Sequence, residues 1–312
     1  MGMLQEVHGK KLGVSKLLAL SALAALAIAG ISQTTHAALV ASDNAGNYTS
    51  GQWTGSNTAY DQGTGFQTWR ISQSGTSGLF LANPSDNKGG PNDIVPPSGS
   101  NIWGVYANAN NNNGGSIQID RSFTNAADTG VGKLDPGETF SIALSSDGVS
   151  NGGAIGFNLQ SSGSTSGYLF QMIFAGGSSY MQINDGSVST PYTLSSVPFS
   201  DFGTLSGDNG GIVANITIGS AVAGGGYNYS LTVTNAAGTT TYQTVSGRQT
   251  SAGAINQFQV FDSNAGSNLY FNNIAVAVPT PATAGLVLAG GIGLAAVLLN
   301  NRRRFGRKTQ PV

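Results

Sequence analysis

The chain has no cysteine, and its only two histidines, His8 and His36, lie near the amino terminus. Residues 38–312 therefore have neither a thiol nor an imidazole. That excludes catalytic sites of the Ser-His-Asp or Cys-His type, zinc sites built from histidine and cysteine, and haem held by either residue. Disulfides are excluded too, so the folded part must be held together by its core.

Charge is also scarce, and it is unevenly placed. Between residues 38 and 278 the chain has five basic and 13 acidic residues, which gives a formal charge of −8 against −1 for the whole chain. Glu138 is the single glutamate in this part. A strongly acidic surface repels polyanions, so nucleic acid and anionic membrane surfaces are poor partners.

The amino-terminal segment has the pattern of a secretory signal peptide. Lys10, Lys11 and Lys16 come before an apolar stretch, Leu17–Ala29, and small residues stand before a cleavage point after Ala37. This order of charge, apolar stretch and small residues is typical of an export signal. The sequence predicts a signal peptide over residues 1–37; an uncleaved anchor is the alternative, which the short apolar stretch disfavours.

The carboxyl-terminal segment has three parts in a fixed order. Val278-Pro279-Thr280-Pro281 comes first, then an uncharged run from Ala282 to Leu299, then a basic tail over residues 300–312. The run is long enough for a helix of roughly 27 Å, close to the hydrocarbon thickness of a membrane. The basic tail favours the cytoplasmic side. We expect a single transmembrane helix over 282–299, with a plain membrane anchor as the alternative.

These three parts resemble the PEP-CTERM sorting signal of exported bacterial proteins. The matching positions are Val278, Pro279, Thr280, Pro281, Arg302, Arg303 and Arg304, with Thr280 standing where the family usually has glutamate. The resemblance implies processing by an exosortase-like membrane protease. It also implies transit through the inner membrane to the cell surface or extracellular matrix, and an association with exopolysaccharide and biofilm.

The part between the two signals has the composition of an all-β protein. Glycine, serine, threonine and asparagine dominate, strong helix formers are scarce, and short apolar alternations recur between turn residues. We therefore predict one extracellular domain over 38–277, an antiparallel β-sandwich or jelly roll. The expected strands are Gly65–Ser72, Gly78–Ala82, Asn101–Ala107, Ser116–Phe123, Thr139–Leu144, Ala154–Gln160, Tyr168–Phe174, Ser179–Ile183, Gly211–Ile218, Tyr227–Thr234, Thr239–Val245, Asn256–Phe261 and Leu269–Ala277.

Tight turns are expected at Leu134–Glu138 and Asn184–Gly186, where proline, asparagine, aspartate and glycine cluster. Gly115–Phe123 and the closing segment Leu269–Ile274 resemble concanavalin-like or laminin-G-like sandwiches of exported proteins.

Three tryptophans, Trp53, Trp69 and Trp103, all fall in the first third of the chain. If their rings were exposed together they would form a stacking platform for sugar rings. The alternative is burial in the core, the commoner place for tryptophan in a sandwich.

Oxygen-bearing side chains gather in two loops and suggest calcium as the one candidate cofactor. Asp262, Asn264 and Asn268 precede the last strand, and a second group consists of Asp86, Asn87, Asn92 and Asp93. Hard oxygen ligands suit Ca²⁺. Neither group matches an EF-hand loop, and such residues also stabilise turns by themselves.

Two facing carboxylates, which glycoside hydrolysis requires, are not evident in the pattern. Glu138 lies in a predicted turn, and the Glu-x-Asp-x-x-Glu cluster of sandwich glucanases is absent. The sequence thus predicts a non-enzymatic exported surface or matrix protein. The main alternative is a carbohydrate-binding or adhesive module, and the second is a glycoside hydrolase.

Overall fold

The computed structural model describes residues 38–49, 53, 61–82, 101–109, 114–124, 132–146, 148–161, 168–186, 192–198, 211–223, 225–249 and 253–278. The predicted leader, the positions 279–281 and 302–304 of the sorting motif, the apolar run and the basic tail lie outside these residues. All the described strands belong to one compact unit, Ala37–Pro279. Within the part of the chain that the structure describes, no helix is long and apolar enough to cross a membrane.

Fifteen strands and one short 3₁₀ helix, η1 (Ala45–Asn47), make up the described secondary structure. The strands are β1 (Ala38–Asp43), β2 (Arg70–Ser74), β3 (Ser77–Ala82), β4 (Ile102–Ala107), β5 (Ser116–Ser122), β6 (Thr139–Ser146), β7 (Ala154–Gln160), β8 (Tyr168–Ala175), β9 (Tyr180–Asn184), β10 (Tyr192–Pro198), β11 (Ile212–Ala221), β12 (Tyr227–Asn235), β13 (Thr241–Gln249), β14 (Gln257–Ser263) and β15 (Asn268–Val278).

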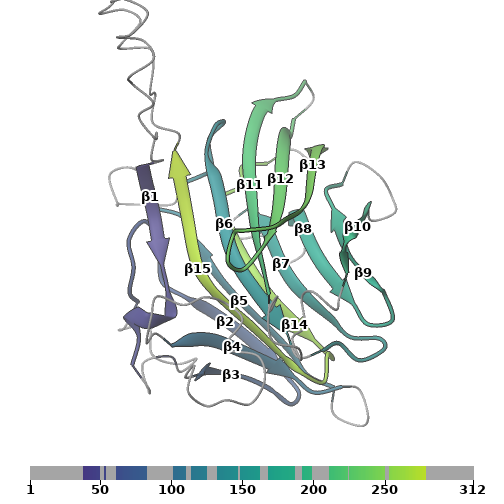
Figure 1. Cartoon of the computed structure of the whole chain (residues 1–312). Helices are drawn as coiled ribbons and strands as arrows, with labels where there is room; N and C mark the ends of the chain where they lie inside the picture. Colours follow the sequence, from purple (N-terminus) through teal and green to yellow (C-terminus); the bar gives the residue numbers. More distant parts are fainter. Residues whose placement is uncertain are drawn as a thin grey trace, which may run out of the picture. The chain divides into compact units, whose positions relative to one another are not determined.

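The strands form two antiparallel sheets (Figure 1). The eight-stranded sheet has the order β13-β12-β11-β6-β15-β4-β3, with β1 paired to β15 as well. The seven-stranded sheet has the order β10-β9-β8-β7-β14-β5-β2. The first and last strands of the domain lie side by side, since Ala38 pairs with Val278. Both ends of the described chain therefore leave the fold at the same place.

The core lies between the two sheets, and the side chains that each strand points inward build it. Along β11 the residues are alternately buried and half-buried from Ile212 to Thr217, because successive side chains point to opposite faces of a sheet. Aromatic rings meet from the two sheets: Phe140 of β6 lies 5.5 Å from Phe258 of β14 and 5.9 Å from Phe157 of β7, between ring centres. The arrangement is a β-sandwich.

The all-β prediction is confirmed, with two strands added that the sequence pattern did not indicate. β1 follows the predicted cleavage point directly, and β10 ends in Pro198. The expected turn at Leu134–Glu138 forms, with Gly137 at a φ of 95°. Gly186, at a φ of 73°, lies in a bend after β9, and the rest of that connection lies outside the described residues. Val278, which the sequence assigns to the sorting motif, is the last residue of β15 and pairs in the sheet.

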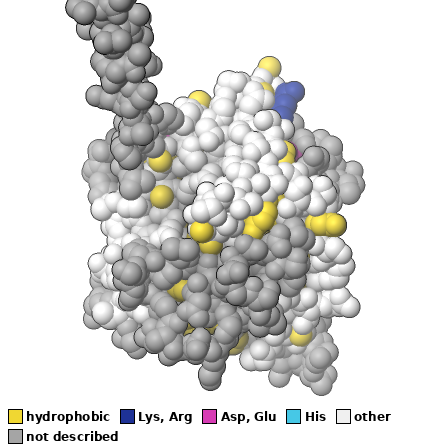
Figure 2. All heavy atoms as spheres, in the orientation of Figure 1, with side chains coloured by type: hydrophobic (Ala, Val, Ile, Leu, Met, Phe, Trp, Pro, Cys, Tyr) yellow, Lys and Arg dark blue, Asp and Glu magenta, His cyan; other side chains and the backbone are white. Residues whose placement is uncertain are grey.

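The described surface is mostly uncharged and polar. In the orientation of Figure 1, few lysine, arginine or acidic side chains are seen, and hydrophobic ones are scattered singly (Figure 2). Among the described residues, the large hydrophobic side chains that are exposed are Val40, Tyr168 and Tyr180.

Candidate functional site

The three tryptophans lie in the core, so the exposed aromatic platform is wrong. Trp53, Trp69 and Trp103 are 5%, 6% and 0% exposed. Their rings pack on one another, with 5.0 Å between the ring centres of Trp53 and Trp69 and 5.5 Å between those of Trp69 and Trp103. Trp103 also stacks on Phe271 of β15 at 5.2 Å. Their indoles fill the space between the sheets and leave no face for a sugar ring.

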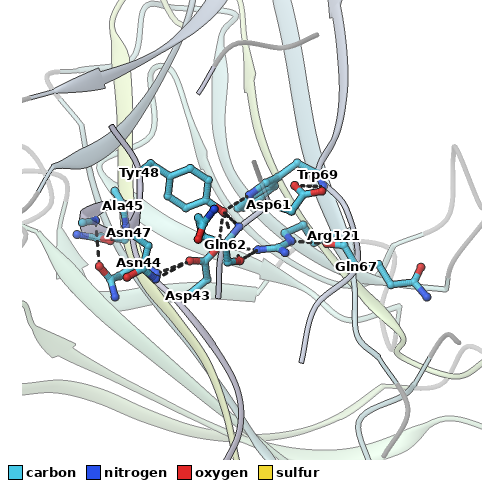
Figure 3. A network of polar contacts seen from close by, with 12 residues as sticks. Asp43, Asn44, Ala45, Asn47, Tyr48, Asp61, Gln62, Gln67, Trp69 and Arg121 are labelled. Carbon is cyan, nitrogen blue, oxygen red and sulfur yellow. Dashed lines mark hydrogen bonds and ion pairs between the residues drawn. The ribbon is translucent and has the colours of Figure 1, made fainter. Parts of the chain in front are cut away.

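A buried polar network lies beside this aromatic cluster (Figure 3). The Arg121 guanidinium donates to an Asp43 carboxylate oxygen at 2.5 Å, and both side chains are almost completely buried. The Tyr48 hydroxyl donates to Asp43 at 2.7 Å and accepts from the Trp69 indole at 3.0 Å. Burial raises the pKa of Asp43, while the Tyr48 hydrogen bond and the Arg121 charge oppose that shift.

This network fixes the amino-terminal segment to the sandwich. Arg121 projects inward from β5, and its guanidinium lies 5.2 Å from the ring centre of Phe66 and 4.9 Å from that of Trp69. Cation–π contacts of this kind stabilise a desolvated arginine. Asp43 ends β1, so the ion pair connects the two sheets. With its members enclosed and paired, the network is structural rather than a binding site.

The calcium candidates of the first group differ in their surroundings. Asp262 is completely buried on β14, next to Ile117 and Ile155 of the neighbouring strands, and burial raises its pKa to about 8. Both of its carboxyl oxygens are enclosed and are not open to solvent. The Asn268 amide donates to the Tyr270 hydroxyl at 3.0 Å. Among the described residues, no three acidic or histidine side chains gather as a metal group would require.

One candidate of the first calcium group, Asn264, and the whole second group remain to be placed. Asn264 lies in the turn after β14 with φ of 50°, and its backbone amide donates to the carbonyl of Gly115 at 2.9 Å. The second predicted group, Asp86, Asn87, Asn92 and Asp93, lies outside the described residues.

Glu138 borders an open cleft of about 720 Å³ near the two ends of the domain. Its carboxylate accepts the backbone N–H of Asp135 at 2.9 Å, and the Asp135 carboxylate pairs with Lys133 at 3.0 Å. Partial burial raises the pKa of Glu138. Because Glu138 caps the turn in which Asp135 lies, the two carboxylates stabilise that turn rather than face each other across a substrate.

The outer face of the seven-stranded sheet carries a feature that the sequence analysis missed. Six polar side chains stand opposite one another on six neighbouring strands, and we call them the polar row. From β2 to β9 they are Arg70, Asp120, Gln259, Asn158, Gln171 and Asn184. They point away from the core, because their neighbours along each strand, such as Ile119, Phe157 and Ile183, are buried in it and successive side chains point to opposite faces.

Side-chain hydrogen bonds run along most of the polar row. The side-chain amide of Gln171 donates to the side-chain oxygen of Asn158 at 3.1 Å. The side-chain amide of Asn158 donates in turn to the side-chain oxygen of Gln259 at 2.8 Å. At one end Arg70 donates to Asp120 at 2.7 Å. These bonds hold the side chains in defined positions on a rigid sheet, and preorganised polar groups of this kind bind ligands with less loss of entropy.

Exposure increases from the middle of the polar row to its ends. Asn158 and Gln259 are 6% and 8% exposed, whereas the Arg70 side chain is 53% exposed. At the other end, Asn184 donates to the hydroxyl of Tyr168 at 2.7 Å, and Tyr168 is 37% exposed. Tyr168 thus places a partly exposed aromatic ring beside the polar row, whereas the three tryptophans are buried in the core.

No protein-family model matches the chain, and no curated protein matches it. Several solved structures have a distant likeness. One belongs to work on endo-acting O-glycanases that human gut microbiota express to initiate mucin breakdown, at 8% identity and a TM-score of 0.46, covering 78% of this chain and all of that one. Another is the catalytic domain of a family 131 glycoside hydrolase from Coprinopsis cinerea, at 13% identity and a TM-score of 0.41, covering 79% and 99%.

A third is the cellulose-induced protein Cip1, at 14% identity and a TM-score of 0.39, covering 67% of this chain and 90% of that one. All three TM-scores are below 0.5, so the fold assignment rests on the strands and sheets of this chain itself.

Proposed function

We propose that this chain is an exported protein of the cell surface or extracellular matrix that binds polysaccharide through the outer face of its seven-stranded sheet, without catalysis. The polar row is the observation that carries the proposal. It places a guanidinium, a carboxylate and four amides on one face at the regular spacing of neighbouring strands. Sugars are recognised by planar polar groups that pair with their hydroxyls and by aromatic rings that stack on their apolar faces.

The aromatic contribution comes from Tyr168. Its ring is partly exposed, and its hydroxyl is held by Asn184. A tyrosine fixed at one end and open on the other loses little conformational entropy when a ligand stacks on it. Tyr180, 39% exposed on the neighbouring strand β9, adds a second open ring on the same face. In this proposal these tyrosines replace Trp53, Trp69 and Trp103 as the stacking residues.

The non-catalytic part of the proposal rests on the acids of that sheet. Among the described strands of the seven-stranded sheet, the carboxylates are Asp120 and Asp262. Asp120 faces outward and is paired with Arg70, and Asp262 is enclosed in the core. Glycoside hydrolysis needs two carboxyl groups facing one bond. The polar row contains a single carboxylate, that of Asp120, and it is already paired with Arg70.

The route to the surface is part of the same proposal. The leader over 1–37 directs export, and the Pro279-Thr280-Pro281 motif with the apolar run and Arg302–Arg304 directs sorting by an exosortase-like protease. Mass spectrometry of the surface-associated protein tests this step. We expect no peptides from residues 282–299 in that form, and their recovery would show a retained membrane anchor instead.

A glycan array tests the binding step. We expect the purified domain to bind a subset of polysaccharides, and an Asn158→Ala variant to bind them about 3- to 10-fold more weakly, the value of one hydrogen-bonding side chain. The matched control is Thr232→Ala on the outer face of the other sheet, where Thr232 lies 3.4 Å from Thr244 between hydroxyl oxygens.

Because Asn158 is nearly buried, Gln171→Ala provides a second variant at a half-buried position. Near-ultraviolet circular dichroism confirms that each variant is folded. If the wild type binds no glycan, or both variants bind as tightly as the control, the polar row is not a binding site.

A further inference from the structure

The two charged members of the polar row neutralise each other. A terminal nitrogen of Arg70 lies 2.6 Å from an Asp120 carboxylate oxygen. The same nitrogen donates to the side-chain oxygen of Gln257 at 2.6 Å. Arg70 therefore has a carboxylate and an amide oxygen on its guanidinium before any ligand arrives. An arginine that binds an anion needs those donors free to make the two-pronged contact with carboxylate or phosphate.

The remaining members offer donors and acceptors in equal measure. Each primary amide has two N–H donors and a carbonyl with two lone pairs. The hydrogen bonds run in one direction, from Gln171 to Asn158 to Gln259, and Gln259 reaches Gln118 at 3.4 Å. Asn158 and Gln259 therefore each use one donor and one acceptor position in this series of hydrogen bonds, and Gln171 uses one donor position. A hydroxyl group matches the remaining positions because it both donates and accepts, whereas a carboxylate or sulfate oxygen only accepts.

The net charge of the domain also disfavours an anionic ligand. Residues 38–278 carry a formal charge of −8. Attraction of a polyanion to this surface would have to overcome that charge, and at low ionic strength the repulsion acts over tens of ångströms.

The direction of the polar row gives the shape of the ligand. Its members follow neighbouring strands rather than one strand, so the row runs across the sheet. Five steps between six strands at about 4.8 Å each give a length of roughly 24 Å. Tyr168 lies at the β8–β9 end, and Arg70 lies on β2 at the other end.

From these observations we infer that the ligand of the polar row is a neutral, extended polysaccharide that lies across the strands, with Tyr168 stacking on a sugar ring at one end. The inference rests on the proposed polysaccharide-binding function and adds the charge and orientation of the chain.

Isothermal titration with two ladders of oligosaccharides, from disaccharide to hexasaccharide, tests the charge. One ladder contains neutral glucans, mannans and galactans, and the other contains alginate and polygalacturonate fragments. We expect at least one neutral series to bind more than about 10-fold more tightly than any uronate series, with little change on adding salt.

Tighter binding of uronates, weakening as salt rises, would overturn this inference while leaving the proposed function intact. Binding of neither ladder would overturn both.

Variants at the two ends of the row test the orientation. Gln118 is exposed on β5, beside the row and toward its β2 end, and its side-chain oxygen lies 3.4 Å from the Gln259 amide nitrogen. Gln118→Ala on that side and Tyr168→Ala at the β8–β9 end should each weaken binding of the neutral hexasaccharide about 3- to 10-fold. A disaccharide cannot contact both ends, so at most one of the two variants should weaken it. Thr232→Ala is the control and should change neither. Equal weakening of the disaccharide by both variants, or no weakening of the hexasaccharide by either, would contradict a chain that crosses the strands.

Discussion

Two aspartates are buried in opposite ways in this sandwich. Asp43 of β1 is 3% exposed and Asp262 of β14 is 0% exposed. Asp43 accepts from Arg121, Tyr48, Asn47 and the backbone of Asn44. Neither carboxyl oxygen of Asp262 has a hydrogen bond of ordinary geometry. The backbone groups of Ala265 and Ala107 lower the pKa of this carboxyl, but by less than burial raises it.

The difference shows two solutions to the cost of burying an acid. At Asp43 the sandwich supplies a cation and hydrogen-bond donors, so the charged form is compensated where it lies. At Asp262 it supplies mainly apolar neighbours, and burial raises the pKa of that carboxyl to about 8. The first aspartate serves as an ion pair and the second as a neutral acid. Four substitutions test this contrast, and they are ordered by expected effect.

Removing the cation should have the largest effect. An Arg121→Met variant keeps most of the side-chain volume and leaves Asp43 buried without its charged partner. Loss of one partner of a buried pair costs about 3–5 kcal/mol. Urea unfolding measures the difference, and the Asp43→Asn, Arg121→Met double variant should recover part of it. A loss below about 1 kcal/mol in the single variant would show that Tyr48 and the amides suffice for Asp43.

Replacing the neutral acid should raise stability above neutral pH. The pKa of Asp262 is higher in the folded protein than its ordinary value, so the folded state holds a proton that the unfolded state releases. The stability that this proton contributes is complete below about pH 4 and is lost as pH rises through about 8.

Asp262→Asn removes this dependence. The variant should gain about 2–4 kcal/mol over the wild type at about pH 9 and little at about pH 4. Denaturant unfolding at both pH values measures the gain. An equal difference at the two values would mean that Asp262 does not titrate in this range.

Deleting one hydroxyl of the network should have a moderate effect. Tyr48→Phe removes the hydroxyl that donates to Asp43. The same hydroxyl accepts from the Trp69 indole N–H and from the backbone N–H of Gln62, and both donors lose it. Buried groups left without partners cost about 1–2 kcal/mol here, because Arg121 still compensates Asp43. Thermal unfolding measures it, and Tyr180→Phe, at an exposed position, is the control. A loss as large as that of Arg121→Met would place the tyrosine rather than the arginine at the centre of the network.

The smallest effect is expected where the same pair of residue types meets at the surface. The side chains of Arg70 and Asp120 are 53% and 15% exposed. Exposed ion pairs contribute about 0–1 kcal/mol because water and salt screen them. Arg70→Gln should therefore change unfolding by less than about 1 kcal/mol, measured under the same urea conditions as Arg121→Met. A loss of several kcal/mol would mean that the outer face depends on this pair as the core depends on the buried one.

The sequence by itself determined the class of the fold and much of its outline. Alternating apolar residues between turn residues placed most strands, and the Leu134–Glu138 segment with Gly137 placed a turn. β1 and β10 were missed for different reasons. β1 depends on pairing with β15 at the far end of the chain, and β10 is an edge strand that ends in a proline, which an interior strand would not accept.

The tertiary structure alone decided which side chains meet. Alternation gives each strand two faces, but the pairing of strands decides which faces form the core and which residues stand opposite each other. It buried Trp53, Trp69 and Trp103, and it brought Asp43 onto Arg121. It also aligned Arg70 with Asn184, far apart in the chain, at the two ends of one row. Register between distant strands depends on packing of the whole sandwich, which no local pattern in the sequence contains.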